Sequence, residues 1–290
     1  MNHLSDIKAQ YYIKLEDGLV HCTLCPHNCH IENGKTGICG VRVNKGGHLY
    51  AESYGLISSM ALDPIEKKPL YHFFPGSKIL SAGSYGCNFR CSYCQNYSIS
   101  MEKPDTVYIS PESLVYKAYD LKDSGNIGLA YTYNEPFISY EYVLDCCKLA
   151  KEKKLKNVLV TNGYVQEAPL KEILPFVDAM NIDLKSFSDD FYKRICKGKA
   201  DYVKRTIENS AASCHVEVTC LIIPGLNDSE EEISGLASFL AGISPDMPLH
   251  LTRFFPRYKM TDREPTPVET LKKLYVIAKK KLKHVYLGNV

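Results

Sequence analysis

The feature that most constrains the fold is a regular alternation of short apolar runs with longer amphipathic segments, which begins at Ile79. Short apolar runs bounded by turn residues predict strands, and apolar residues at helical spacing predict helices. The expected strands are 79–82, 127–133, 157–161, 179–184, 215–223, 249–254 and 284–287. The expected helices are 111–122 with Ser110 as its N-cap, 138–154, 166–176, 189–195, 201–213, 228–240 and 267–282. This alternation predicts an α/β fold with a parallel sheet and right-handed crossovers, and six strand–helix units predict a partial (β/α)6 barrel.

The loop after the first expected strand carries three cysteines in the spacing C-x3-C-x2-C, namely Cys87, Cys91 and Cys94. Iron–sulfur clusters are held by closely spaced Cys thiolates, and a cubane has four irons, so three local thiols leave one iron without a protein ligand. An open position on a metal is where a substrate binds. The alternatives are three buried core thiols or a zinc site, but zinc needs a fourth ligand and normally shows two separated Cys pairs. The spacing therefore favours a cluster with one open iron.

A second group of cysteines lies near the N-terminus in the pattern C-x2-C-x3-C-x9-C, formed by Cys22, Cys25, Cys29 and Cys39. Tetrahedral thiolate sites suit zinc or an iron–sulfur cluster, and the spacing leaves both open. The segment is too polar to fold on a core of its own, so metal binding would supply its folding energy. We predict that residues 1–76 form a Cys-rich N-terminal module with its connector, and that residues 77–290 form the barrel.

The connector between the two parts is rich in proline and charge. Residues 63–77 contain Pro64, Pro69 and a closing Pro-Gly pair, which predicts a rigid segment that is neither helix nor strand. Lys67, Lys68 and His72 could line the active site, but the sequence alone favours an exposed, charged linker.

Composition excludes several classes of function. The chain has 290 residues, 45% hydrophobic residues and a net charge of +2 spread along its length, which argues against nucleic acid as a partner. The first ten residues lack the apolar region of a signal peptide, and no apolar run approaches membrane-spanning length. Twelve cysteines without a secretion signal indicate a reducing compartment and metal binding, so we expect a cytoplasmic protein.

Polar residues recur where the expected strands end. The second strand is followed by Asn134 and Glu135, the third by a Thr-Asn-Gly turn, and the fourth by an Asp-Leu-Lys sequence. Residues 224–228 and 253–258 follow the fifth and sixth strands. Active sites of parallel barrels lie at the carboxyl ends of the strands, so these segments are expected to gather around the three-Cys loop.

The three-Cys loop, with an aromatic residue before its third Cys, resembles the signature of the radical SAM superfamily. From Ile79 onward the chain is similar to the activating enzymes of glycyl radical proteins, the pyruvate formate-lyase activating type. The N-terminal Cys block, residues 63–74 and the Cys-Gln-Asn ending of the loop resemble one branch, the radical SAM component of the AmmeMemoRadiSam system. The resemblance implies that Cys87, Cys91 and Cys94 bind a [4Fe-4S] cluster and that S-adenosylmethionine occupies the open iron.

The resemblance also implies a set of S-adenosylmethionine contacts. They comprise an aromatic behind the adenine, a segment that holds the methionyl amino group, a ribose segment and an Asp-x-Lys pair near the methionine carboxylate. The matching residues are, in that order, Tyr93; Asn134 and Glu135; Thr161 and Asn162; Asp183 and Lys185.

Three departures from the relatives stand out. Val160 takes the place of an Asp that commonly precedes Thr-Asn-Gly in glycyl radical activases, which argues against the cation site built partly from that Asp. Tyr258 stands where those relatives carry a His. Members of the branch often continue with another C-x2-C pair, so a chain that ends at Val290 is expected to be truncated or to lack that element.

The function expected from these features is an oxidoreductase-type radical SAM enzyme, similar to pyruvate formate-lyase activating enzyme. It would reductively cleave S-adenosylmethionine and use the 5′-deoxyadenosyl radical to take hydrogen from a substrate. The alternatives are a glycyl radical activase with a protein partner, and a non-catalytic cluster- or zinc-binding scaffold. Expected partners are an electron donor such as flavodoxin or ferredoxin, and Memo-type and AMMECR-type proteins. The remaining cysteines, among them Cys146 and Cys196, are interpreted as small buried hydrophobes.

Overall fold

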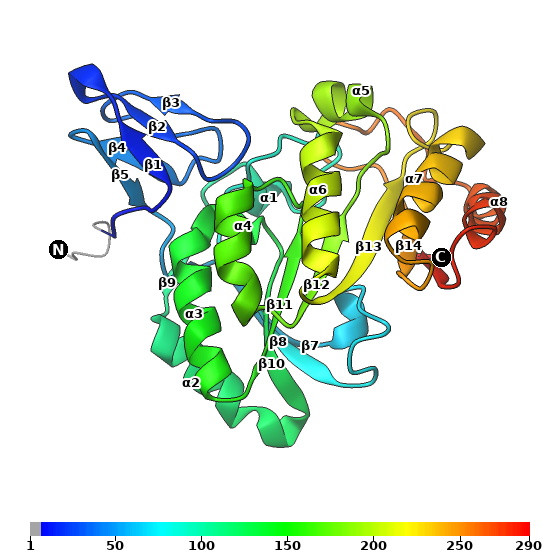
Figure 1. Cartoon of the computed structure of the whole chain (residues 1–290), viewed down its shortest axis with the longest axis horizontal. Coiled ribbons are helices and arrows are strands. Elements are labelled where there is room, and N and C mark those ends of the chain that lie inside the picture. Colours follow the sequence, from blue (N-terminus) through cyan, green and yellow to red (C-terminus); the bar gives the residue numbers. More distant parts are fainter. Residues whose placement is uncertain (1–6) are drawn as a thin grey trace.

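The computed structural model describes residues 7–290, so the first six residues of the predicted N-terminal module lie outside the described part. Its centre is an eight-stranded sheet in the order β15-β14-β13-β12-β11-β10-β8-β7 (Figure 1). All neighbours from β8 to β15 pair in parallel. These strands are β8 (Lys78–Gly83), β10 (Asn126–Tyr131), β11 (Lys156–Thr161), β12 (Ala179–Asp183), β13 (His215–Ile222), β14 (Leu249–Arg253) and β15 (Val285–Gly288). The predicted α/β fold with an open parallel barrel is confirmed.

Helices connect the parallel strands, as the sequence predicts. They are α2 (Pro111–Asp120), α3 (Tyr140–Glu152), α4 (Glu167–Ile173), α6 (Ala200–Ala211), α7 (Glu230–Ile243) and α8 (Val268–Lys279), with the short α1 (Tyr97–Ser100) and α5 (Asp189–Phe191). Ser110 caps α2, because its side chain accepts a hydrogen bond from the backbone N–H of Ser113. In Figure 1, α3, α4 and α6 stand in front of the strands. The predicted helix 189–195 is instead the short α5 followed by a π-helical turn, Tyr192–Cys196.

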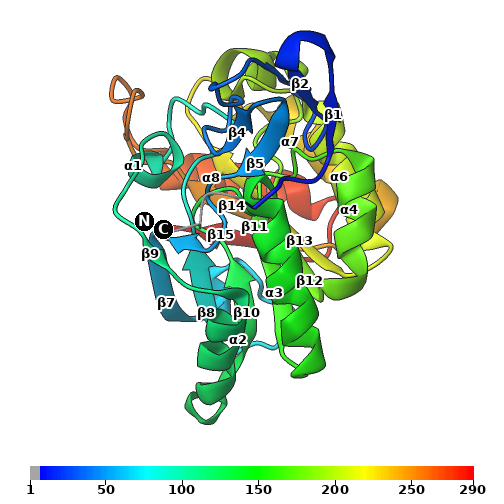
Figure 2. The same cartoon turned by 90° about the vertical axis from the view of Figure 1, so that its left-hand side faces the viewer.

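One strand of the sheet was not predicted. Strand β7 (Ser59–Pro64) pairs antiparallel with β8 and forms the edge of the sheet (Figure 2). The prediction that residues 63–77 contain neither helix nor strand is therefore wrong at their start, where Asp63 and Pro64 end β7 and a 3₁₀ turn follows at Ile65–Lys67. Pro64 is tolerated in a strand because it lies at the last position of an edge strand.

The rest of the connector crosses to the far strands of the sheet. The backbone N–H of His72 donates to Glu217 on β13 (2.7 Å), and the carbonyl of Pro69 accepts from Asn181 on β12 (2.9 Å). Glu217 is fully buried and also contacts the ring of His250 on β14 (2.6 Å). These bonds tie the connector to two central strands of the sheet, β12 and β13.

The N-terminal module consists of a three-stranded sheet, β1-β2-β3, and short antiparallel pairs. It contains β1 (Tyr12–Lys14), β2 (Val20–Cys22), β3 (His30–Ile31), β4 (Arg42–Lys45), β5 (His48–Ala51) and β6 (Leu56–Ile57), the last paired with β9 (Val107–Tyr108). Its buried Val20, Leu24 and Leu49 belong to the same apolar core as the barrel. A buried ion pair between Arg42 and Glu141 of α3 (3.0 Å) joins the two parts. Within residues 7–290, no helix has both the length and the apolar character needed to cross a membrane.

Candidate functional site

A cavity of about 370 Å³ opens at the carboxyl ends of the parallel strands. The structure brings all ten barrel residues that the sequence predicts for the cluster and for S-adenosylmethionine to this one cavity. They are Cys87, Cys91, Tyr93, Cys94, Asn134, Glu135, Thr161, Asn162, Asp183 and Lys185. These residues come from a single loop and from the ends of three further strands, so only the parallel topology makes them neighbours.

The loop between β8 and α1 presents its three thiols to the cavity. Gly86 begins the turn at φ +84°, and a Cβ at this position would lie 2.6 Å from the carbonyl oxygen of Cys39, so only glycine fits there. The backbone N–H of Phe89 donates to the sulfur of Cys87 (3.3 Å), and the side-chain amide of Asn162 lies 3.6 Å from the same sulfur. Cys87 is thereby fixed between its own loop and the end of β11.

The number of thiols in the loop fits a cluster with one open position. A cubane has four irons, so three thiolates leave one iron for another ligand. Three thiols on the wall of one cavity, with free space in front of them, fit a cluster of this kind.

A fourth thiol lies beside this loop, which sequence analysis did not foresee. Cys196 ends the π-helical turn and is fully buried, and its carbonyl accepts from the backbone N–H of Arg90 (3.0 Å). Its sulfur lies 3.8 Å from the hydroxyl of Tyr93. The neighbouring Cys196 lowers the pKa of Cys91, whereas burial raises the pKa of Cys87.

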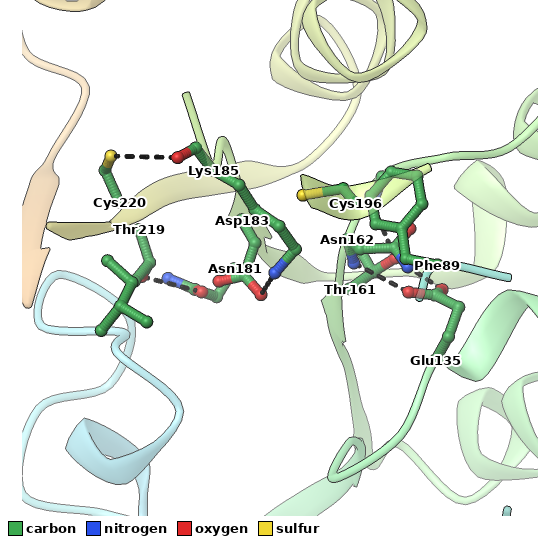
Figure 3. Close-up of polar contacts among 12 residues, drawn as sticks. Phe89, Glu135, Thr161, Asn162, Asn181, Asp183, Lys185, Cys196, Thr219 and Cys220 are labelled. Atoms are coloured by element: carbon green, nitrogen blue, oxygen red, sulfur yellow. Dashed lines mark hydrogen bonds and ion pairs between the residues drawn. The ribbon is translucent and has the colours of Figure 1, made fainter. Parts of the chain in front are cut away.

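The carboxylate of Glu135 is buried at the end of β10 (Figure 3). It accepts hydrogen bonds from the hydroxyl of Thr161 (2.7 Å), the backbone N–H of Asn162 (2.8 Å) and the backbone N–H of Phe137 (3.0 Å). Burial nevertheless outweighs these bonds and raises the pKa of Glu135 to about 7. The cavity therefore holds a fixed carboxylate that a cation would keep in its charged form.

Asp183 and Lys185 form an ion pair at the end of β12, with 2.9 Å between the carboxylate and ammonium groups (Figure 3). Burial would lower the pKa of Lys185, but attraction to Asp183 outweighs it and the pKa is raised. The backbone of Lys185 is held from both sides, because its carbonyl accepts from Asn227 (2.8 Å) and its N–H donates to Tyr192 (3.0 Å). Lys185 thus stays charged and fixed beside the cavity.

Lys67 and Lys68 also line the cavity, so their interpretation as part of an exposed linker is wrong for Lys68. The side chain of Lys68 is 4% exposed, and its ammonium group lies 2.8 Å from the carboxylate of Asp63 on β7. The hydroxyl of Tyr133 donates to the same carboxylate (2.9 Å). Pairing of β7 with β8 brings this charged group to the cavity, and no local pattern in the connector encodes that pairing.

Two segments expected at the site do not line the cavity. Residues 224–228 and 253–258 lie beyond it, and β13 and β14 contribute Thr219, Leu221 and Thr252 instead. The side chain of Arg253 does not line the cavity and instead donates to the carbonyl of Thr266 (2.7 Å). Successive side chains of a strand face opposite sides, so adjacent residues at a strand end have different surroundings.

The four N-terminal cysteines belong to a segment that packs against the cluster loop. Within residues 7–290, these cysteines included, no three His, Cys, Asp or Glu side chains are arranged to hold one metal ion. Burial, together with the charges of the other three cysteines, raises the pKa of Cys25 to about 12. The imidazole of His27 lies 2.7 Å from the carbonyl of Asn88, next to Cys87. The module therefore packs directly on the loop that carries the three thiols.

An open parallel barrel whose strand ends surround a three-thiol loop, a buried carboxylate and a fixed lysine defines a class of enzymes that do their chemistry at a metal cluster. The comparison with family models identifies the family. The model of the radical SAM superfamily matches residues 82–237, which is more than half of the chain, and the chain belongs to this superfamily. Members of the superfamily use a [4Fe-4S] cluster and S-adenosylmethionine, so the protein is a radical SAM enzyme.

Individual relatives agree with this assignment. A protein of Methanocaldococcus jannaschii described as uncharacterized is 43% identical over 289 residues, which cover 98% of this chain and 85% of the relative. The pyruvate formate-lyase-activating enzyme of Clostridium pasteurianum is 33% identical over 171 residues, which cover 54% of this chain and 67% of the relative. A radical SAM methyltransferase from Sphaerobacter thermophilus has the same fold, with a TM-score of 0.58, 17% identity and coverage of 74% of this chain and 67% of that one.

Proposed function

We propose that this enzyme reductively cleaves S-adenosylmethionine and uses the resulting 5′-deoxyadenosyl radical to take a hydrogen atom from its substrate. Cys87, Cys91 and Cys94 would hold the [4Fe-4S] cluster, which supplies one electron to the sulfonium when bound. That electron breaks one carbon–sulfur bond, leaving methionine and the radical. The observation that carries the proposal is the shared cavity, where three thiols face a buried carboxylate and a fixed lysine.

The side chains around the thiols suit the functional groups of S-adenosylmethionine. Glu135 would accept from the ammonium and Lys185 would pair with the carboxylate, because charge-assisted hydrogen bonds are the stronger kind. Both side chains already have hydrogen-bond partners, so binding orders few groups. The further proposed contacts are Asn134 to the amino group, Thr161 and Asn162 to the ribose, Tyr93 to the adenine and Asp183 near the carboxylate.

The substrate is proposed to be small or partly enclosed. Lys68 and Tyr133, held to Asp63 of the β7 edge, form part of the wall of the cavity, and the N-terminal module packs on the Cys loop. A small molecule needs a covered pocket, whereas a protein substrate needs an open groove. A second candidate is activation of a glycyl radical protein, which the similarity to pyruvate formate-lyase-activating enzyme supports.

The finer assignments from sequence remain part of the proposal. They are membership of the AmmeMemoRadiSam branch with Memo-type and AMMECR-type partners, electron supply by flavodoxin or ferredoxin, and the division into residues 1–76 and 77–290. Cys22, Cys25, Cys29 and Cys39 are proposed to hold zinc or a second iron–sulfur cluster, which their C-x2-C-x3-C-x9-C spacing supports.

Anaerobic reconstitution with iron and sulfide tests the proposal. We expect about four irons per chain for one cubane, or about eight if the N-terminal site also holds one. After reduction, the protein should release 5′-deoxyadenosine from S-adenosylmethionine, and the variant with Cys87, Cys91 and Cys94 all changed to Ala should release none. Release of 5′-deoxyadenosine by that variant would reject the proposal. Absence of the product from a wild-type protein loaded with iron would favour a non-catalytic scaffold.

A further inference from the structure

We propose that Lys67 and Lys68 form a subsite for an anionic group of the substrate, which makes the substrate a small molecule with a carboxylate or phosphate group. The inference rests on the proposed function, because it concerns the same cavity and requires S-adenosylmethionine beside the Cys loop. It gives a role to two lysines that the proposed contacts with S-adenosylmethionine do not use. Both lysines line the cavity, although they belong to the connector rather than to the barrel.

The charges on the cavity wall divide into two groups. Within residues 7–290, the acidic and basic side chains that line the cavity are Lys67, Lys68, Glu135, Asp183 and Lys185. Glu135 and the Asp183–Lys185 pair match the ammonium and carboxylate groups of S-adenosylmethionine. The charges that remain on the wall are both positive, so this part of the cavity suits an anion.

Lys68 is held at the cavity by two neighbours. Its ammonium group lies 2.8 Å from the carboxylate of Asp63 and 4.8 Å from the centre of the Tyr133 ring. The hydroxyl of Tyr133 donates to the same carboxylate oxygen (2.9 Å), so the three side chains form one network. An ammonium group has three donors, and within residues 7–290 only Asp63 accepts a hydrogen bond from Lys68. The other donors are available to a group in the cavity.

The backbone at Tyr133 has the shape that this network requires. Tyr133 follows β10 with φ 71°, a left-handed conformation that is rare for a residue with a bulky side chain. Gly83 at the end of β8 makes room for it, because a Cβ at that position would lie 2.9 Å from the Tyr133 ring. Strained conformations of this kind cluster at sites that hold ligands. The conformation of Tyr133 therefore supports a binding role for the network.

The network carries more positive than negative charge. Lys67 lies 3.4 Å from the second carboxylate oxygen of Asp63, so one carboxylate serves two ammonium groups. Burial acts to raise the pKa of Asp63, but hydrogen bonds from Lys68 and Tyr133 hold it at about 2, and the carboxylate is charged. Burial lowers the pKa of Lys68, although Asp63 opposes this shift. An anion in the cavity would balance the excess charge and stabilise the charged form of Lys68.

Anaerobic titration calorimetry with inorganic phosphate and with succinate tests the inference on protein that holds S-adenosylmethionine and an oxidised cluster. We expect the wild type to bind at least one of the two probes, and the tighter probe shows which anionic group the subsite prefers. Lys68→Gln should bind that probe about tenfold more weakly, the size expected for a lost hydrogen bond between charged groups. Lys67→Gln, which removes a more exposed lysine, should bind it about twofold more weakly. The matched control is Lys272→Gln, which removes an exposed lysine on α8 and should bind as the wild type does.

Asp63→Asn separates a binding role of Lys68 from a structural one. The Asn carbonyl can still accept from Lys68 and Tyr133, which share one oxygen of Asp63, but the competing negative charge is removed. This variant should therefore bind the probe about fivefold more tightly than the wild type. If Lys68 serves only to pair with Asp63, both substitutions break the same ion pair and neither strengthens binding. Asp63→Asn also decides if Lys68→Gln does not fold, because tighter binding supports the inference and weaker or unchanged binding overturns it.

The outcomes separate this inference from the proposed function. A wild type that binds S-adenosylmethionine but neither probe would overturn the inference and leave the proposed function intact. Equal affinities of folded Lys68→Gln and the wild type for the probe would overturn it as well. If the wild type binds no cluster, the proposed function fails and the inference fails with it.

Discussion

Replacing Glu135 by Gln is the sharpest test of how the cavity binds S-adenosylmethionine. The substitution keeps the shape of the side chain and removes the negative charge. The carboxylate faces three donors, at Thr161, Phe137 and Asn162. A Gln carbonyl can still accept from the first two, but its NH₂ group then faces the N–H of Asn162. The variant thus loses the charge that would attract an ammonium group and one bond that holds the side chain.

The expected loss follows from the strength of hydrogen bonds to charged groups. Such bonds contribute about 1.5–3 kcal/mol, which corresponds to roughly 10- to 150-fold weaker binding of S-adenosylmethionine. The pKa of Glu135 is raised to about 7, so its charged fraction grows from roughly a tenth at pH 6 to a half at pH 7. The affinity of the wild type for S-adenosylmethionine should therefore rise about fivefold from pH 6 to pH 7, and the affinity of Glu135→Gln should stay constant.

Anaerobic titration calorimetry of the reconstituted proteins with S-adenosylmethionine at pH 6 and pH 7 measures both effects. Asp190→Asn is a suitable control, because this exposed carboxylate pairs with Arg194 on the surface and should bind as the wild type does. The reasoning fails if Glu135→Gln binds within about threefold of wild type at pH 7, or if its affinity keeps the wild-type dependence on pH.

Two predictions concern stability, both measured by urea unfolding. Arg42→Met should lower the free energy of unfolding by about 3–5 kcal/mol, because it removes the ion-pair partner of the buried carboxylate of Glu141. Arg194→Met, which breaks an ion pair on the surface, should lower it by less than about 1 kcal/mol. Equal losses would contradict the role of Arg42 in joining the module to the barrel. Burial acts to raise the pKa of Glu217, but bonds from two histidines and backbone N–H groups hold it at about 2. The charged Glu217 contributes fully to the free energy of unfolding above the unfolded pKa near 4.5, and this contribution is lost as the pH falls toward 2. The free energy of unfolding of Glu217→Gln should therefore be about 3 kcal/mol lower than that of the wild type at pH 7, and the difference should shrink as the pH falls. A deficit that is independent of pH would refute this account.

The sequence alone was sufficient for the barrel, because its signals are local. Strand and helix boundaries agree with the expected ranges to within a few residues from β8 to β15. The main exception is the helix after β12, where a π-helical turn replaces regular helix from Tyr192. Parallel topology then dictated that the strand ends, and the residues that follow them, would meet around the Cys loop.

The surroundings of Lys68 and Cys196 depend on contacts between residues that are far apart in the sequence. The burial of Lys68 beside Asp63 depends on an edge strand that pairs antiparallel with β8, and the sequence of the connector carries no sign of that partner. Cys196 is isolated in the sequence, more than 100 residues from Tyr93, yet the two side chains meet. Periodicity and motif spacing report on neighbours along the chain, so they find the residues that a loop or a strand end carries. Only the folded backbone determines which distant side chain packs against them and with what charge.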